Sequence, residues 1–370
     1  MNAVFNNYAE HPGEFIREEL EARNWSQRDL AYILGVPEQS VSQIVSGRRG
    51  ISAEMAKALG DAFGTSAELF ANLQKAWELA KAKAPDPAIA RRGRVLSKYP
   101  LREMIQRGWI MDSTPELLEM QLCRFFEVRS FDEVPHMLPH AAKKTNYDEV
   151  PSTQLAWLYR VRHIAREMVT PSYSPEALRR ALNEMSELKT SPEQTRHVPR
   201  LLHEAGVRYV IVESLPGAKI DGVCTWIGDA PVIGMSLRFS RIDNFWFVLR
   251  HECAHVLHGH GKTAPVIDVE LEKQDANSEE EVLANAEASE FCIDQIKMKS
   301  FIIRKNPYFS EKDLLAFSKR TRTHPGIIAG QIQRHTQRWE LFRKHQVSVK
   351  ESVASTAILD GWGDVVPVDL

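Results

Sequence analysis

The chain has 370 residues, of which 43% are hydrophobic and 26% are charged, and its formal net charge is −2. This composition predicts a globular protein that is long enough for two or three domains with packed cores. The sequence contains no run of eighteen apolar residues, and its amino terminus has no charged-then-apolar signal pattern. We therefore expect a cytoplasmic protein rather than a secreted or membrane protein.

Two helices joined by a tight turn are predicted close to the amino terminus. Ser26 is a favourable N-cap for the first helix, Gly35 can supply the turn, and Pro37 can begin the second helix. Apolar residues recur at helical spacing in both helices, at Leu30, Ala31, Leu34, Val41, Ile44 and Val45. This spacing predicts that the two helices share one core.

The second of these helices carries Gln39, Ser40 and Gln43 away from its apolar side, and short polar side chains can read base edges in a major groove. The segment resembles the helix-turn-helix domain of Xre/HigA-type antitoxins and phage-like repressors over roughly residues 8–80, and we assign residues 1–83 to this domain. The resemblance implies contacts to a phosphate from Gln27, to bases from Gln39, Ser40 and Gln43, and to the DNA backbone from Arg48 and Arg49.

Charge limits how this domain can bind DNA. Residues 1–80 contain seven Lys or Arg and eleven Asp or Glu, a net charge of −4. DNA affinity must therefore come from the local face, where residues 39–53 include two arginines and no acid. We expect weak binding by a monomer, and hence a homodimer on a palindromic operator. A protein-interaction module of the same fold is the alternative.

The middle of the chain is predicted to contain a linker, a helical region and a small group of strands. Residues 84–95 combine two prolines with three arginines and are predicted to be a linker. Residues 96–200 show helical segments separated by prolines, with no catalytic constellation. Runs of β-branched and aromatic residues at 207–214, 223–227 and 232–237 then predict a small sheet. Four widely spaced cysteines, without a C-x-x-C pair, predict reduced core thiols.

The run His251-Glu252-Cys253-Ala254-His255 has the H-E-x-x-H spacing of metal-dependent hydrolases. Two histidines four residues apart lie on one face of a helix, so both imidazoles can bind one Zn²⁺. The intervening Glu252 then reaches the metal-bound water as a general base. His258 is too far along the helix, at roughly 10 Å from His251, to be a third ligand of the same ion.

The third ligand is therefore expected on a later helix that starts near Ser278, where Glu281 is placed for a capping box. Glu287 is the favoured ligand because it lies among small and apolar residues, where an unpaired carboxylate would be costly. Glu290 also has apolar neighbours and is the alternative.

Residues 231–238, the H-E-x-x-H run and the segment 287–292 together resemble the ImmA/IrrE family of metallopeptidases, over roughly residues 200–340. The sequence departs from the family pattern at Ser289 and Cys292, which are both small. The resemblance implies a gluzincin-like zinc site that cleaves a protein, often a helix-turn-helix repressor. His324 is a candidate for stabilising the oxyanion, with packing at a helix start as its alternative role. We assign residues 201–345 to this domain and 346–370 to a tail.

Together these features predict an α+β protein that is mostly α, with an all-α helix-turn-helix domain, a helical region and a zincin-like domain with a small sheet. The predicted function is a DNA-binding transcriptional regulator whose zinc-dependent endopeptidase cleaves a repressor or antitoxin-type protein, or itself, to control a stress, phage or toxin-antitoxin operon. The alternative is a non-proteolytic HigA-like antitoxin or autorepressor whose metal domain senses a signal or binds a toxin. Expected partners are operator DNA, a repressor substrate, a cognate toxin and a second copy of the chain.

Overall fold

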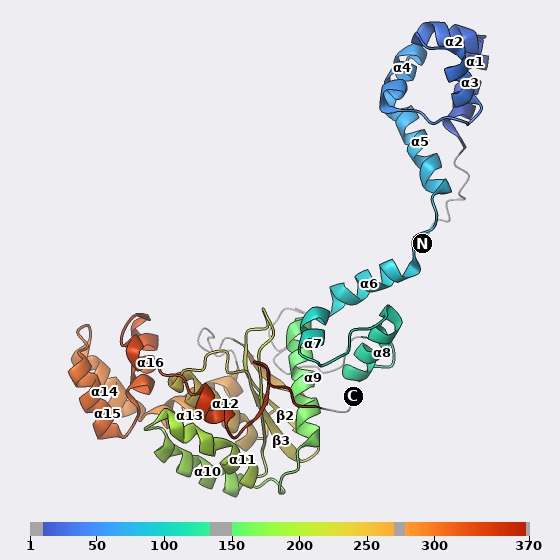
Figure 1. Ribbon diagram of the computed structural model, residues 1–370. Helices are drawn as coiled ribbons and strands as arrows, with labels where there is room; N and C mark the ends of the chain where they lie inside the picture. The colour runs from blue at the N-terminus through green and yellow to red at the C-terminus, as the bar shows by residue number, and fades with distance from the viewer. Residues whose placement is uncertain (1–9, 134–149, 270–277, 368–370) are drawn as a thin grey trace. The chain divides into compact units, whose positions relative to one another are not determined.

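The computed structural model describes residues 10–133, 150–269 and 278–367, and the chain divides into two compact units, Met1–Pro87 and Ala88–Leu370 (Figure 1). None of the helices in these ranges is both long and apolar enough to cross a membrane. The four cysteines are free thiols, as predicted, and three of them are buried.

The described part of the first unit is a bundle of helices around one core. Its helices are α1 (Pro12–Arg23), α2 (Gln27–Leu34), α3 (Glu38–Val45), α4 (Ala53–Phe63) and α5 (Ala67–Lys81). Ser26 caps α2 by accepting a hydrogen bond from the backbone N–H of Asp29, and Gly35 ends α2 at a φ of 66°, which glycine adopts without strain. The predicted helix-turn-helix is therefore confirmed.

The described part of the second unit is built on a five-stranded sheet with the order β4-β2-β3-β1-β5. The strands are β1 (Arg208–Val212), β2 (Ile220–Ile227), β3 (Ala230–Met235), β4 (Val266–Val269) and β5 (Ile358–Asp360). β1 pairs in parallel with β3 and β5, whereas β2 pairs antiparallel with β3 and β4. The three predicted strands correspond to β1, β2 and β3. The sequence did not predict β4 and β5, which form the two edges.

Helices cover both faces of this sheet (Figure 1). The described helices from Pro87 onward are α6 (Pro87–Lys98), α7 (Leu101–Gln106), α8 (Pro115–Phe125), α9 (Ser152–Glu167), α10 (Pro175–Leu188), α11 (Val198–Glu204), α12 (Ile242–Leu257), α13 (Glu279–Cys292), α14 (Gln295–Lys305), α15 (Glu311–Thr321), α16 (Pro325–Thr336) and α17 (Lys350–Ala354), with the 3-10 turns η2 (Pro192–His197) and η3 (Arg343–His345). Side chains of α7, α8 and α9 share a core with one face of the sheet, and those of α10, α11 and α12 share a core with the other face. A separate small core joins α14, α15 and α16.

Three predicted boundaries differ from the structure. Residues 84–95 are not an extended linker throughout, because α6 begins at Pro87, a position where proline is compatible with a helix start. Residues 96–200 are not a separate region, because their described helices pack on the sheet within one unit. Residues 346–370 are not a free tail, since they contain α17 and β5.

Buried polar contacts explain why the last of these segments folds back. Asp360 on β5 is 1% exposed, and its Oδ2 accepts a hydrogen bond of 3.0 Å from the indole N–H of Trp109. The guanidinium of Arg160 on α9 forms a buried ion pair with the same carboxylate. The carboxy-terminal segment is therefore part of the core of the second unit.

Candidate metal centre and nucleic-acid interface

The H-E-x-x-H motif lies in the second half of α12, the helix that packs against both β2 and α13. His251, Glu252 and His255 are all fully buried. The two imidazoles face each other one helical turn apart, with 3.0 Å between their Nε2 atoms. This is the arrangement that the spacing predicted, because residues four apart share one face of a helix.

Two carboxylates complete a cluster with these imidazoles. Asp268 on β4 places its Oδ2 3.3 Å from the Nε2 atom of His251. Glu281, in the first turn of α13, lies 3.4 Å from the Nε2 atom of His251 and 3.5 Å from that of His255. One ligand atom from each of the four residues lies within 4.8 Å of the other three. The site is thus assembled from three separate segments of the chain.

The prediction of Glu287 as the third ligand is not supported by this geometry. Its carboxylate lies 2.6 Å from the guanidinium of Arg250 and 2.8 Å from Nε2 of His258, so it is paired elsewhere. Glu281 occupies the expected place instead. The alternative Glu290 accepts a hydrogen bond from the backbone N–H of Gln295 just beyond the end of α13.

Asp268 was missed because its signal in the sequence is short. It is a single acid within Val266-Ile267-Asp268-Val269, a run that is otherwise β-branched and apolar. Alternation along a strand turns the carboxylate to the side of the sheet that α12 covers. An acid inside such a run, located soon after an H-E-x-x-H motif, is the feature that could have indicated it.

Glu252 is held without a hydrogen-bond partner on either carboxylate oxygen among the described residues. Its side chain fits because residue 222 on β2 is glycine: a Cβ atom there would lie 2.0 Å from Oε1 of Glu252. Burial, and then the neighbouring carboxylate of Asp268, raise the pKa of Glu252 well above its usual range. A buried acid without partners is costly unless the site contains another charged group.

The two imidazoles differ in their electrostatic surroundings. Burial alone would lower the pKa of His251, but the carboxylates of Asp268 and Glu281 more than offset it and raise the pKa to about 10. Burial lowers the pKa of His255 to about 4. The acidic groups therefore favour one positive charge between them, which a proton on His251 supplies in the absence of a metal.

These residues fit a divalent metal ion such as Zn²⁺. Imidazole nitrogens and carboxylate oxygens are the donors that zinc takes in proteins. Nδ1 of His251 and Oδ2 of Asp268 have no hydrogen-bond partner among the described residues. Nδ1 of His255 lies 2.9 Å from Nδ1 of His260, a contact that orients the imidazole with its Nε2 toward the cluster.

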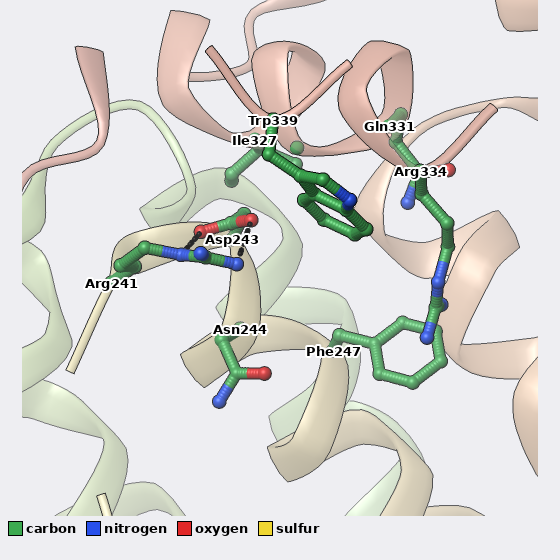
Figure 2. A pocket seen from close by; sticks show the side chains of 9 residues that line it. Arg241, Asp243, Asn244, Phe247, Ile327, Gln331, Arg334 and Trp339 are labelled. Carbon is green, nitrogen blue, oxygen red and sulfur yellow. Dashed lines mark hydrogen bonds and ion pairs between the residues drawn. The ribbon is translucent and has the colours of Figure 1, made fainter. Parts of the chain in front are cut away.

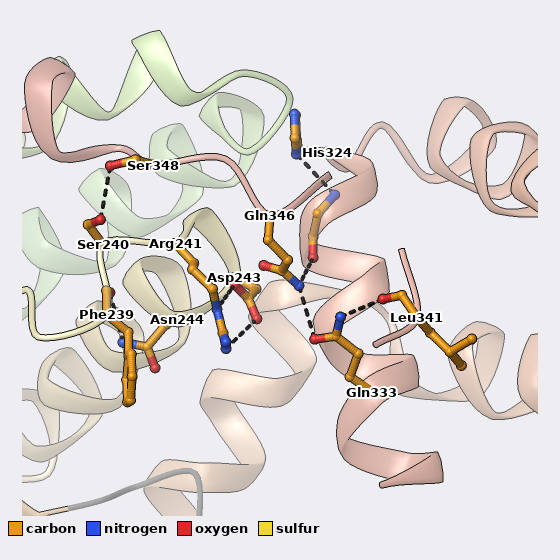
Figure 3. Close-up of polar contacts among 11 residues, drawn as sticks. Phe239, Ser240, Arg241, Asp243, Asn244, His324, Gln333, Leu341, Gln346 and Ser348 are labelled. Carbon is orange, nitrogen blue, oxygen red and sulfur yellow. Dashed lines mark hydrogen bonds and ion pairs between the residues drawn. The ribbon is translucent and has the colours of Figure 1, made fainter. Parts of the chain in front are cut away.

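His324 is placed at a helix start rather than in this cluster. Its Nδ1 accepts a hydrogen bond of 3.0 Å from the backbone N–H of Gly326, and it is the N-cap of α16 (Figure 3). Nearby, the amide of Gln346 contacts the carbonyl oxygen of Gly326 and the side chain of Gln333. Among the described contacts, His324 has none with His251, Glu252 or His255. Its contacts agree with the alternative role, which is packing at the start of a helix.

A small pocket lies between the start of α12 and one side of α16 (Figure 2). Arg334 stacks its guanidinium over the ring of Phe247, 4.8 Å from the centroid, and Arg241 pairs with Asp243 at 3.2 Å. The ring of Phe247 in turn stacks against His251, with 6.2 Å between centroids. The cavity volume is about 30 Å³, which is enough for water.

The helix-turn-helix in the first unit presents the predicted DNA face. Val41, Ile44 and Val45 of α3 are buried in the core. The six predicted contact residues all retain exposure: Gln39, Arg48 and Arg49 are exposed, and Gln27, Ser40 and Gln43 are half-buried. The side chains that would face DNA are therefore accessible.

Comparison with known proteins identifies this first unit. The Helix-turn-helix family matches residues 16–70. The HTH-type transcriptional regulator YddM of Escherichia coli (strain K12) is 35% identical over 72 residues, which cover 20% of this chain and 77% of YddM. Virulence-associated protein I of Dichelobacter nodosus is 38% identical over 80 residues, 21% of this chain and 74% of that protein. The chain therefore belongs to the helix-turn-helix family through its amino-terminal unit.

Two solved structures are similar to the same part of the chain. The Pseudomonas aeruginosa antitoxin HigA with the higBA promoter is 45% identical, with a TM-score of 0.19, covering 20% of this chain and 79% of that chain. PA4674 from the same organism, in complex with a 28 bp operator DNA, is also 45% identical with a TM-score of 0.19, covering 20% and 80%.

Proposed function

We propose that the protein is a DNA-binding transcriptional regulator with a zinc-dependent endopeptidase domain, which cleaves a helix-turn-helix repressor, an antitoxin-type protein or its own chain. The observation that carries the peptidase proposal is the buried cluster of His251, His255, Asp268 and Glu281 beside Glu252, whose carboxylate has no partner among the described residues. Such a concentration of acids and imidazoles, buried except for the half-buried Glu281, is costly for folding and supports a metal site.

DNA binding is proposed for the accessible face of α3. Gln39, Ser40 and Gln43 are placed to contact base edges, and Arg48 and Arg49 follow the helix where phosphates would lie. YddM is named as a transcriptional regulator, and HigA was solved with its promoter. A homodimer on a palindromic operator, in the cytoplasm, completes this part of the proposal.

The chemistry is proposed to be peptide hydrolysis, in which His251, His255 and Glu281 would hold Zn²⁺. Bound zinc polarises a scissile carbonyl and lowers the pKa of water at the site. Glu252 is the general base: its carboxylate accepts a proton from the attacking water and returns that proton to the leaving amine. His260 keeps the imidazole of His255 oriented for this role.

One observation favours a second function. Asp268 supplies a fourth donor, and zinc sites with four protein ligands are usually structural. On that reading the protein is a non-proteolytic HigA-like antitoxin or autorepressor, and its metal domain senses a signal or binds a cognate toxin. The two functions differ in whether any protein is cut.

A cleavage assay distinguishes them. The full-length protein with zinc is incubated with purified helix-turn-helix repressors encoded beside it, and fragments are followed on a denaturing gel. We expect fragments of a repressor or of the chain itself, which disappear when a chelator is added. Replacement of Glu252 by Gln should retain zinc and reduce cleavage by about 10²- to 10⁴-fold, because it removes the general base. Undiminished cleavage by E252Q contradicts the assigned role, and absence of fragments in every mixture favours the antitoxin function.

A further inference from the structure

We propose that Asp268 is a metal ligand that closes the site, so that the resting enzyme is latent until this carboxylate is displaced. The inference rests on the proposed metal site of His251, His255 and Glu281, and it adds a mode of regulation to that site. A catalytic zinc site keeps one coordination position free of protein ligands. Here the protein itself supplies a group for that position.

The four side chains lie close enough together to share one ion. Donors about 2.0–2.2 Å from an ion in tetrahedral geometry lie about 3.3–3.6 Å from one another. Oδ2 of Asp268 is 3.3 Å from Nε2 of His251 and 4.0 Å from Nε2 of His255. Oε2 of Glu281 is 3.4 Å from Nε2 of His251, and Oε1 of Glu281 is 3.5 Å from Nε2 of His255. Asp268 therefore lies at ligand distance from His251, as Glu281 does, and somewhat farther than Glu281 from His255.

The described surroundings of Asp268 are the two imidazoles and the carboxyl group of Glu252. Its side chain is 2% exposed, and within the described ranges its ion pairs are those with His251 and His255. No Lys or Arg side chain pairs with it there, and Oδ2 accepts no hydrogen bond from the described residues. A buried carboxylate needs a positive charge beside it, which His251 supplies when it is protonated and which a metal ion between the imidazoles would supply in its place.

The strand that carries Asp268 is suited to releasing it. β4 has four residues and lies at the edge of the sheet, and among the described strands it pairs with β2 alone. The pairing is irregular at this point, because Gly222 faces Asp268 while Ile220 faces Val269, which leaves Asp221 as a bulge. Bulges occur beside active sites, where they redirect a side chain. A short edge strand with an interrupted ladder can shift at lower cost than a central strand.

Latency follows from this placement. A substrate carbonyl needs the coordination position that Asp268 occupies, so binding of substrate or of an activating partner must first move the carboxylate. An extended peptide pairing along the outer edge of β4, which no described strand covers, is the kind of partner that could do so, since such pairing uses backbone groups of that strand. The site would then have three protein ligands and become competent for hydrolysis.

The test uses full-length protein loaded with Co²⁺, whose visible absorption reports the number and kind of ligands. Four proteins are compared: the native chain, D268A, D268N and, as a control, D229A, which changes an exposed acid in the turn between β2 and β3. We expect the native chain and D229A to give a four-ligand spectrum that does not change with pH. D268A and D268N should bind one Co²⁺ per chain and give a pH-dependent spectrum, because a solvent ligand that can ionise replaces the carboxylate.

A pH-dependent spectrum in the native chain, or spectra of D268A and D268N that match the native one, would overturn the closure by Asp268 while leaving the metal site intact. Failure of the native chain to bind Co²⁺ or Zn²⁺ refutes the metal site and this inference together. D268N keeps the size of the side chain, so it remains informative if D268A does not fold. With zinc, the Asp268 variants should also cleave a substrate at least tenfold faster than the native chain, and slower cleavage contradicts latency.

Discussion

Glu281 and Glu287 lie six residues apart on α13, and their carboxylates serve different partners. Six residues of helix span about 9 Å, so the two side chains cannot reach the same ion. Glu281 meets the imidazoles of His251 and His255, whereas Glu287 pairs with Arg250 and His258. Glu281 is therefore placed as a metal ligand, whereas Glu287 forms ion pairs that join α13 to α12.

Replacement of Glu281 by Ala should lower zinc affinity by more than about 100-fold, because loss of a residue that only supports a ligand already costs about 10- to 100-fold. Glu287→Ala is the matched control on the same helix, and it should change zinc affinity much less. Competition with a chromogenic chelator measures both affinities. A larger loss in E287A than in E281A would restore Glu287 as the ligand.

The sequence could identify only the part of this site that is local in the chain. His251, Glu252 and His255 are fixed by helical spacing, so their proximity was predictable. Asp268 and Glu281 reach them through the placement of β4 and α13 in the tertiary structure, and no periodicity encodes that placement. The argument for Glu287 assumed that its carboxylate was unpaired, whereas Arg250 and His258 satisfy it.

At the scale of elements, length decided which parts of the fold could be predicted. The strands β1, β2 and β3 have five to eight residues with clear β-branched runs and turns between them. β4 and β5 have four and three residues, too few for an alternating pattern to emerge. The helix-turn-helix was predictable because Ser26, Gly35 and Pro37 mark the boundaries of α2 and α3.

The segment after α3 provides a test of DNA binding. Arg48 and Arg49 are exposed and follow the helix proposed to enter the major groove. Each phosphate contact makes the fall of log affinity with log salt steeper by about 0.9. The R48A/R49A double variant should therefore have a shallower slope, less negative by about 1.8. Lys75→Ala on α5 is the control and should leave the slope unchanged. Titration of the full-length protein with its own promoter fragment over a salt series measures the slope, and an equal slope in all three proteins would place the phosphate contacts elsewhere.

At the scale of the whole molecule, the carboxy-terminal segment closes the second unit. β5 pairs with β1, and Asp360 receives buried contacts from Trp109 and Arg160, which lie 200 residues or more earlier in the chain. Residues 346–370, predicted to be a tail, thus cover β1 with a further strand and supply the carboxylate that pairs with the guanidinium of Arg160. The contacts that fix this segment come from residues far earlier in the chain, so the sequence of the segment by itself does not indicate them.

Replacement of Asp360 by Ala should destabilise the second unit by about 3–5 kcal/mol, because it leaves the buried guanidinium of Arg160 without its carboxylate. The control is Asp132→Ala, which removes a surface pair with Arg94 whose carboxylate side chain is 77% exposed. That change should cost at most about 1 kcal/mol. Denaturant unfolding of both variants measures the difference, and similar stabilities would show that the buried pair contributes little.

The assembly of the metal cluster from α12, β4 and α13 also has a thermodynamic consequence. A ligand that binds only the folded state raises its stability by about 2.7 kcal/mol at a hundredfold excess over its dissociation constant. All four donors lie in the second unit, Ala88–Leu370, and none lies in the first. We therefore expect two calorimetric transitions, of which one rises with free zinc and falls with chelator while the other stays constant. The cell's zinc supply would then set the lifetime of the carboxy-terminal unit without altering the stability of the helix-turn-helix.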